Sequence, residues 1–313
     1  MKRSAFAILN TVLALLFTKA ALAEEEKVLD QGIGPEFLAS YDSEKFSIHK
    51  VSLEYLPSMS HADSLFGVRA SDYRYQQDDW TRHGQKISVL GRQLDPATLN
   101  GWNLEGGVFT QGGHTLATVD GNYRLSLAKR TSLEVFVNRD WVETQTALDR
   151  GVSYTFGGLA LDQGIGPHVT LVGVAGQQYF SDGNRRDHGR VRIIYQPLLD
   201  LGLTLQARYR AYHSSREDVG RAYFNPDHYA EGMLAIGWRQ RYKGWTGLLV
   251  AGLGREKVAD ATQQPTRLFE VGLQSPVRGA QSLRLRAGYN RSASFNGPNY
   301  HYRYALGEWI IRF

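Results

Sequence analysis

Cysteine is absent from the 313 residues, so the fold is held without disulfide bonds whatever the redox state of its compartment. Beyond the first 23 residues no apolar run approaches the 18 or so residues of a membrane-spanning helix. The sequence also contains no nucleophile elbow, no zinc-binding helix motif and no phosphate-binding loop. We therefore predict that the protein is not an enzyme and that it holds no cofactor and no metal ion.

The amino-terminal segment resembles a secretory signal peptide. Lys2 and Arg3 precede an apolar run over residues 5–17, and Ala21-Leu22-Ala23 forms a small-x-small cleavage site. The alternative is a membrane anchor, although the run is short for a span. No cysteine follows the cleavage site, which disfavours a lipoprotein. The expected domains are a signal peptide over residues 1–23 and one further domain over residues 24–313.

Net charge gives no support to a nucleic-acid partner. The full chain carries a formal charge of +5, but three of its basic residues lie in the amino-terminal segment, which leaves 33 basic and 31 acidic residues. The mean hydropathy is −0.36, yet the chain has 17 Tyr, 13 Phe, 6 Trp and 33 Gly. A polar average with many aromatic residues and glycines is typical of a transmembrane β-barrel.

The last thirteen residues alternate with period two. Trp309, Ile311 and Phe313 share one face with small residues, whereas Glu308 and Arg312 occupy the other. The sequence ends on an aromatic residue, as the last strand of an outer-membrane barrel does, although an edge strand of a soluble sheet can show the same pattern. We predict that Trp309, Ile311 and Phe313 form a signal for the barrel-assembly machinery.

The same alternation recurs along the chain. Segments 190–196, 201–213 and 282–291 each place apolar residues on one face and arginines on the other. The full pattern predicts an all-β, antiparallel, up-and-down transmembrane barrel of about sixteen strands, with fourteen as the alternative. The expected strands are 35–41, 46–56, 63–76, 80–93, 100–111, 115–128, 131–143, 147–157, 167–179, 186–196, 201–213, 227–240, 243–257, 266–276, 280–292 and 301–313.

The connections between these strands alternate in length. Short ones, such as residues 129–130 and 277–279, are expected in the periplasm, and longer polar ones, such as residues 214–226 and 293–298, outside the cell. The sequence Leu-Asp-Gln-Gly-Ile-Gly-Pro occurs at residues 29–35 and again at 161–167. This repeat indicates either a duplicated half-barrel or two similar turns.

Charged side chains on the inner face of such a barrel are the candidate ligand-binding residues. A charge facing lipid near the midplane costs about 2–4 kcal/mol, so these residues must face the lumen. They form either an ion-pair network that stiffens the wall or a polar track for a ligand, because guanidinium groups bind hydroxyl, carboxylate and phosphate groups. The candidate track residues are Arg190, Arg192, Arg208, Arg210, Arg284, Arg286, Glu231 and Glu270.

Two other groups of residues, one of aspartates and histidines and one of tryptophans, each allow two interpretations. Asp78, Asp79 and His83, or Asp187 and His188, could activate water in an outer-membrane hydrolase, or they could be solvated loop charges. Four tryptophans lie near expected strand ends and suggest anchoring at the membrane interface, with stacking on sugars as the alternative; they are Trp141, Trp238, Trp245 and Trp309.

The segment Tyr223-Phe224-Asn225-Pro226-Asp227-His228-Tyr229 resembles the barrel domains of bacterial exopolysaccharide export porins, as do Gly237-Trp238-Arg239 and the carboxyl-terminal phenylalanine. The similarity spans roughly residues 120–313. It implies a Gram-negative outer-membrane porin for polysaccharide export in biofilm formation. It also implies a periplasmic helical-repeat scaffold as a partner, beside outer-membrane lipid and the assembly machinery. The alternatives are a plugged surface receptor, for example for phage, and the hydrolase.

Overall fold

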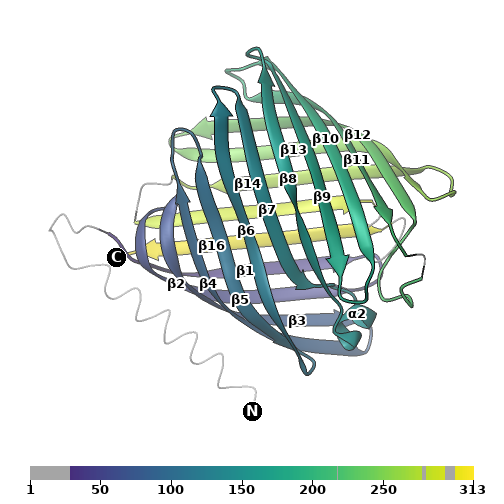
Figure 1. The fold of residues 1–313 in the computed structure, drawn as a ribbon. Helices are drawn as coiled ribbons and strands as arrows, with labels where there is room; N and C mark the ends of the chain where they lie inside the picture. The colour runs from purple at the N-terminus through teal and green to yellow at the C-terminus, as the bar shows by residue number, and fades with distance from the viewer. Residues whose placement is uncertain (1–28, 217, 277–279, 293–299) are drawn as a thin grey trace.

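The computed structural model describes residues 29–216, 218–276, 280–292 and 300–313. Its strands form one closed antiparallel barrel in which each strand pairs with its neighbours in sequence and β1 pairs with β16 (Figure 1). Among the described residues there are sixteen strands: β1 Gly32–Asp42, β2 Ser47–His61, β3 Ser64–Gln77, β4 Trp80–Leu94, β5 Gly101–Gln111, β6 His114–Ala128, β7 Thr131–Trp141, β8 Ser153–Ile165, β9 Val169–Phe180, β10 Arg185–Leu198, β11 Leu203–Ser214, β12 His228–Tyr242, β13 Trp245–Val258, β14 Gln264–Gln274, β15 Gln281–Arg291 and β16 His301–Arg312.

The predicted all-β barrel and its sixteen strands are confirmed, and most boundaries differ from the prediction by a few residues. The first strand begins three residues earlier than expected, so part of the first repeat copy lies within β1. The second copy spans the end of β8 and the turn to β9. The predicted signal peptide over residues 1–23 lies outside the described residues, as do the predicted connections 277–279 and 293–298.

The outer face of the barrel is apolar because alternate residues of each strand point away from the lumen. Ile87 on β4 and Leu234 on β12 are 70% and 71% exposed, values that only contact with lipid makes favourable in a folded protein. Trp238 and Trp245 are also exposed, near the ends of β12 and β13. No helix in the described part of the chain is long and apolar enough to cross a membrane.

The two ends of the barrel differ in their connections. One end, here called the turn end, carries connections such as residues 62–63, 129–130 and 243–244. The other end, the loop end, carries residues 142–152 and 215–227. The longer connections that were predicted to lie outside the cell are thus at the loop end, and their orientation in a membrane stays a prediction.

A short helix, α2 (Gln145–Arg150), lies at the loop end. Thr144 caps its amino terminus by accepting a hydrogen bond from the backbone N–H of Ala147, and Gly151 ends it in the left-handed conformation that glycine favours, with φ 66°. Leu148 is fully buried against inward-facing aromatic residues of the barrel wall. The helix therefore folds into the barrel mouth.

Two apolar clusters flank α2. The first contains Leu148 and the inward-facing side chains of β2, β3, β5 and β6: Ile48, Tyr73, Tyr75, Phe109 and Leu116, together with Phe46 and Trp141. The second joins α2 to the connections at 181–184 and 215–227 and consists of Val142, Ala147, Val152, Phe180, Ala222 and Tyr223. A third cluster fills the lumen near the turn end with Leu56, Met59, Leu90 and Ile310.

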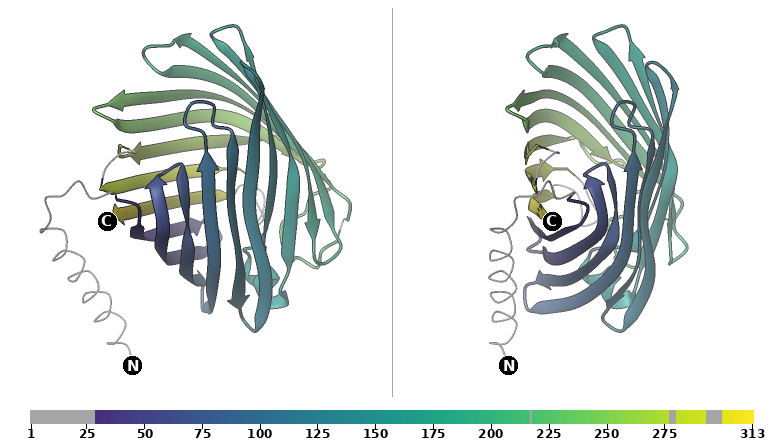
Figure 2. Two further views of the ribbon diagram at one scale, coloured as in Figure 1. Left: turned by 60° about the vertical axis from the view of Figure 1, so that its left-hand side comes forward. Right: turned by 90° about the vertical axis from the view of Figure 1, so that its left-hand side faces the viewer.

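The barrel closes where β1 meets β16. Phe37 pairs with Gly307 on the outer face, and its ring covers this glycine so closely that a Cβ added there would lie 2.2 Å from the ring. The absence of a side chain at residue 307 is therefore required by the packing of Phe37. Figure 2 shows the first strands (purple) following a tight arc, whereas the central strands (teal) form a broad wall.

Candidate functional site in the charged lumen

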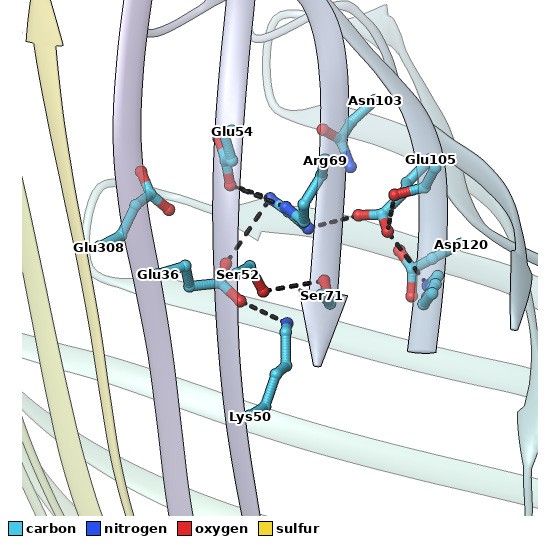
Figure 3. Close-up of polar contacts among 12 residues, drawn as sticks. Glu36, Lys50, Ser52, Glu54, Arg69, Ser71, Asn103, Glu105, Asp120 and Glu308 are labelled. Atoms are coloured by element: carbon cyan, nitrogen blue, oxygen red, sulfur yellow. Dashed lines mark hydrogen bonds and ion pairs between the residues drawn. The ribbon is translucent and has the colours of Figure 1, made fainter. Parts of the chain in front are cut away.

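The lumen-facing charges fall into two groups, and the first lies on β1 to β5. Arg69 is the centre of this group, which we call the ion-pair network (Figure 3). Its guanidinium forms ion pairs with Glu54 and Glu105 and lies 3.6 Å from Glu36. Lys50 pairs with Glu36, and Lys86 Nζ lies 3.1 Å from a Glu105 oxygen.

Burial of the ion-pair network is nearly complete. The side chains of its six members, which are Glu36, Lys50, Glu54, Arg69, Lys86 and Glu105, are between 4% and 16% exposed. Hydroxyl groups extend the network, because Ser88 donates to Glu105 at 2.9 Å and the Ser52 and Ser71 hydroxyls lie 2.9 Å apart. Each carboxylate of the network therefore has a cationic partner within the protein.

The second group, here called the arginine wall, lies on β10 and β11. Arg190 pairs across the strands with Arg210, and Arg192 with Arg208, so two pairs of like charges stand directly opposite each other. Arg190 and Arg192 are exposed to the lumen. Neither makes a hydrogen bond or ion pair with any described residue, and Arg208 is hydrogen bonded only to Gln206, at 2.7 and 3.0 Å.

A cavity of about 350 Å³ adjoins the arginine wall. All four of these arginines line it, together with Glu231 and the apolar side chains Val172, Val174, Met233 and Leu268. These arginines were predicted to face the lumen, and the structure brings Arg190, Arg192, Arg208, Arg210 and Glu231 together around this cavity.

The remaining candidate residues lie apart from the arginine wall. Glu270 accepts a hydrogen bond from the Tyr304 hydroxyl at 2.9 Å, and Arg284 lies 3.5 Å from Glu308 on β16. Arg286 makes no hydrogen bond or ion pair with any described residue and is exposed. These three face the lumen as predicted, but they do not line the 350 Å³ cavity.

Arg210 differs from the other members of the arginine wall because it is held by its neighbours. It forms an ion pair with Glu231 and donates to the Tyr229 hydroxyl at 2.9 Å and to Ser292. Tyr229 in turn donates to Glu256 at 2.9 Å. This buried cluster fixes one edge of the arginine wall.

The ion-pair network was missed by the sequence analysis. Its members lie on five strands, and none forms an Arg-x-Arg pair of the kind that identified the arginine wall. The available signal was the alternation of Lys50, Ser52 and Glu54 with apolar residues on β2, which marks these three as inward-facing. The partners on β3 to β5 depend on strand register, which local alternation does not determine.

The proposed hydrolase residues are not arranged for catalysis. Asp78 lies in the exposed turn after β3, where Lys45 Nζ donates to it at 2.8 Å and this contact raises the pKa of the lysine. His83 points to the outer face of β4. Asp187 and His188 are consecutive on β10, so their side chains point to opposite faces of the wall.

The loop predicted over residues 214–226 as an exposed epitope corresponds to the connection between β11 and β12, and Ala222 and Tyr223 in it are buried. The Tyr223 ring stacks on Phe180 with centroids 4.5 Å apart, and its hydroxyl donates to Asp182 at 3.0 Å. Asn184 donates to the Asn225 side chain at 2.8 Å. The segment that resembles export porins therefore docks onto α2 and the β9–β10 connection.

Three side chains in the described part of the chain could hold a metal ion. His213 and His228 lie across from each other on the outer face at the loop end, and the carboxylate oxygens of Asp227 lie 3.1 Å from Nδ1 of His213 and 2.6 Å from Nδ1 of His228. The potential ligand atoms lie within 4.8 Å of one another. The cluster depends on the pairing of β11 with β12, so the sequence analysis did not detect it.

Glu143 lies outside the membrane-spanning strands, between β7 and α2. Burial, and secondly the nearby Asp140 carboxylate, raise the pKa of Glu143 from 4.5 to about 7. The Tyr75 hydroxyl donates to it at 3.4 Å. The barrel mouth thus contains a carboxyl group that titrates near neutral pH.

The predicted interfacial role is wrong for Trp141, which is only 3% exposed in the apolar cluster against α2. Trp141 is the last residue of β7, and it is buried in the cluster that contains Leu148 of α2. Trp309 and Ile311 lie on the outer face of β16, and the Phe313 backbone N–H donates to Gln31 at 3.1 Å. Their role as an assembly signal stays a prediction.

Comparison with known proteins supports the fold. No family model and no curated sequence matches the chain. A bacterial polysaccharide outer membrane secretin superposes with a TM-score of 0.69 and 11% identity, covering 92% of this chain and 100% of that one. OccD1 (OprD) superposes with a TM-score of 0.44 and 11% identity, covering 93% and 98%, and Pseudomonas aeruginosa OccK5 (OpdH) with 0.43 and 11%, covering 91% and 98%.

The predicted resemblance to a polysaccharide-export barrel is confirmed for the fold. The closed barrel, its apolar outer face and its charged lumen are those of a bacterial outer-membrane barrel, which is the predicted location.

Proposed function

We propose that this barrel is a pore that passes a polysaccharide across the outer membrane, and that the arginine wall is part of its track. The observation that carries the proposal is the cavity beside Arg190, Arg192, Arg208 and Arg210, because Arg190 and Arg192 make no hydrogen bond or ion pair with any described residue. The fold shared with a polysaccharide secretin adds support.

The lining of this cavity suits a sugar polymer chemically. Guanidinium groups donate paired hydrogen bonds to hydroxyl and acidic groups, and Arg190 and Arg192 have donors available for them. Val172, Val174 and Met233 supply apolar surface for the C–H faces of sugar rings. Weak contacts at several positions let a polymer bind without being retained.

Replacement of Arg208 and Arg210 by alanine tests the proposal. We expect reduced glycan secretion by cells and altered single-channel conductance in planar bilayers. The matched control is Arg255→Ala with Arg267→Ala, which removes two arginines from the outer face. Normal secretion together with unchanged conductance in the lumen variant would refute the track.

Two partners belong to this proposal. The assembly machinery would recognise Trp309, Ile311 and Phe313, and a periplasmic helical-repeat scaffold would bind near the turn end. Replacing Phe313 with serine should lower the amount of folded barrel in the membrane. Crosslinking from the turn end, followed by mass spectrometry, should identify the scaffold.

A plugged receptor is the second candidate, because α2 and the connection 215–227 fold into the mouth. Its surface epitope would include the exposed residues Arg216, Asp218 and Arg221. Alanine at these three positions should abolish phage adsorption and leave conductance unchanged if the barrel is a receptor.

A further inference from the structure

The arginine wall contains a charge arrangement that is unfavourable in the isolated protein. Residues directly opposite on antiparallel strands have Cβ atoms about 4.5–5.5 Å apart, and like charges at such positions are destabilising. Both Arg190–Arg210 and Arg192–Arg208 are pairs of this kind. Two adjacent like-charge pairs on the same two strands concentrate positive charge on one patch of the lumen.

Among the described residues, an ion pair is formed at only one edge of this patch. Glu231 is the carboxylate that lines the same cavity, and it forms an ion pair with Arg210. Glu270, two strands away on β14, accepts a hydrogen bond from Tyr304 and attracts Arg208 only at longer range, without an ion pair. Arg190 and Arg192 therefore face the cavity with no ion pair or hydrogen bond to any described residue.

The ion-pair network, on the other side of the lumen, shows how the same protein arranges charges that have a structural role. In the ion-pair network, Arg69 alone contacts three carboxylates, and both lysines have acidic partners. Where this chain uses lumen charges to hold the wall together, it pairs them. Arg190 and Arg192, which have no such partner among the described residues, are therefore assigned a different role from the charges of the network.

We infer that the polymer is anionic, and that Arg190, Arg192 and Arg208 form a binding site for carboxylate groups carried by its sugars. This inference rests on the proposed function for the passage of the polymer, but binding itself does not require passage. Each guanidinium offers a planar pair of donors that matches a carboxylate, and an acidic group between opposed arginines relieves their repulsion. The apolar surface of Val172, Val174 and Met233 lies beside these donors for the sugar ring.

Selectivity and block of single channels test the inference. The wild-type barrel in a planar bilayer should be anion-selective in a salt gradient. Polygalacturonate should block its current at far lower concentration than neutral dextran of the same length or cationic chitosan. Arg190→Gln with Arg192→Gln should shift the reversal potential towards cation selectivity and weaken the polygalacturonate block roughly tenfold or more, because hydrogen bonds to charged groups are among the stronger ones.

Three controls separate the possible outcomes. Arg255→Gln with Arg267→Gln on the outer face should change neither selectivity nor block. Dextran sulfate as a further blocker distinguishes a carboxylate site from one for any polyanion; equal block by dextran sulfate would overturn the carboxylate assignment. Inorganic phosphate tests whether the site binds small anions. Block by phosphate at the same concentration as polygalacturonate would overturn the assignment of the ligand as a polymer.

The measurements distinguish an error in the anionic class of the polymer from an error in the proposal that the barrel is a pore. If dextran and polygalacturonate act alike and the Arg190/Arg192 variant keeps its selectivity, the anionic class is wrong while the pore stands. If no current is seen at all, the pore proposal fails. Calorimetry of polygalacturonate with the detergent-solubilised barrel then decides the inference, and equal heats for wild type and variant would overturn it.

Discussion

The two sides of the lumen use arginine in opposite ways. Arg69 in the ion-pair network is surrounded by carboxylates and shielded from water, with 15% of its side chain exposed. Arg192 in the arginine wall faces another arginine and is exposed to the lumen. The first arrangement removes a charge from solvent and satisfies it within the protein, whereas the second keeps a charge available to something that enters.

This difference indicates how one barrel can have a rigid wall on one side and leave space for a ligand on the other. On the side built by β1 to β7, the third apolar cluster, the ion-pair network and the cluster against α2 follow one another from the turn end to the loop end. Close packing of this kind does not deform easily. The side built by β9 to β15 holds the cavity. Passage, gating and changes in width are thus expected on the second side.

The largest expected effect comes from breaking the network at its centre. Arg69→Met should lower the free energy of unfolding in detergent by about 3–5 kcal/mol, because it leaves Glu36, Glu54 and Glu105 together without their shared cation. Urea titration followed by tryptophan fluorescence measures this change.

The matched variant in the arginine wall is Arg192→Met. It removes the same charge from a position with no partner and relieves repulsion by Arg208, so the stability should be unchanged or slightly higher. Equal destabilisation by the two variants would contradict the division of the lumen into a structural and an available side.

The second effect concerns α2, which packs into the barrel mouth through Leu148. Leu148→Ala removes a fully buried side chain and should cost about 2–5 kcal/mol in the packing of α2. Loosening of α2 should raise the single-channel conductance, since the mouth widens. A destabilised helix with unchanged conductance would show that α2 does not limit the opening.

The smallest expected effect is a pH dependence of the stability of the segment around Glu143, which lies at the same mouth of the barrel. The folded-state pKa of Glu143, about 7, exceeds its ordinary value of 4.5, so folding favours the protonated form. The stability of this segment is then greatest below pH 4.5 and falls as the pH rises to 7. Tyr75, Asp140 and Lys50 are the groups that face it.

Glu143→Gln should remove this dependence, as measured by hydrogen exchange of the α2 amides between pH 4.5 and 8. Asp149→Asn makes the same change of charge on an exposed position of α2 and should retain it. Parallel profiles for wild type and Glu143→Gln would assign the pH response to another group.

Period-two alternation was sufficient to predict the barrel, because each strand must show lipid on one side and water on the other. The same rule identified Arg190, Arg192, Arg208 and Arg210 as inward-facing. It could not identify the Arg69 network or the His213–Asp227–His228 cluster, since both depend on which strands pair and in what register.

Helix α2 was missed for a different reason. Six residues are too few to show a helical period, and residues 147–157 were instead expected to form a strand. The local signals were present in Thr144 as a cap and Gly151 as a stop. The burial of Trp141 follows from tertiary packing in the cluster that contains Leu148, which local sequence does not encode.

The pairing of β1 with β16 sets the order of events during assembly. Until the final strand docks, the growing sheet has two free edges with unpaired backbone groups, and such edges recruit other chains. The contact of Phe37 with Gly307 joins residues 270 positions apart and can form only when the ring shuts. An engineered bulkier residue at position 307 would therefore act late, trapping full-length chains as open sheets prone to aggregation.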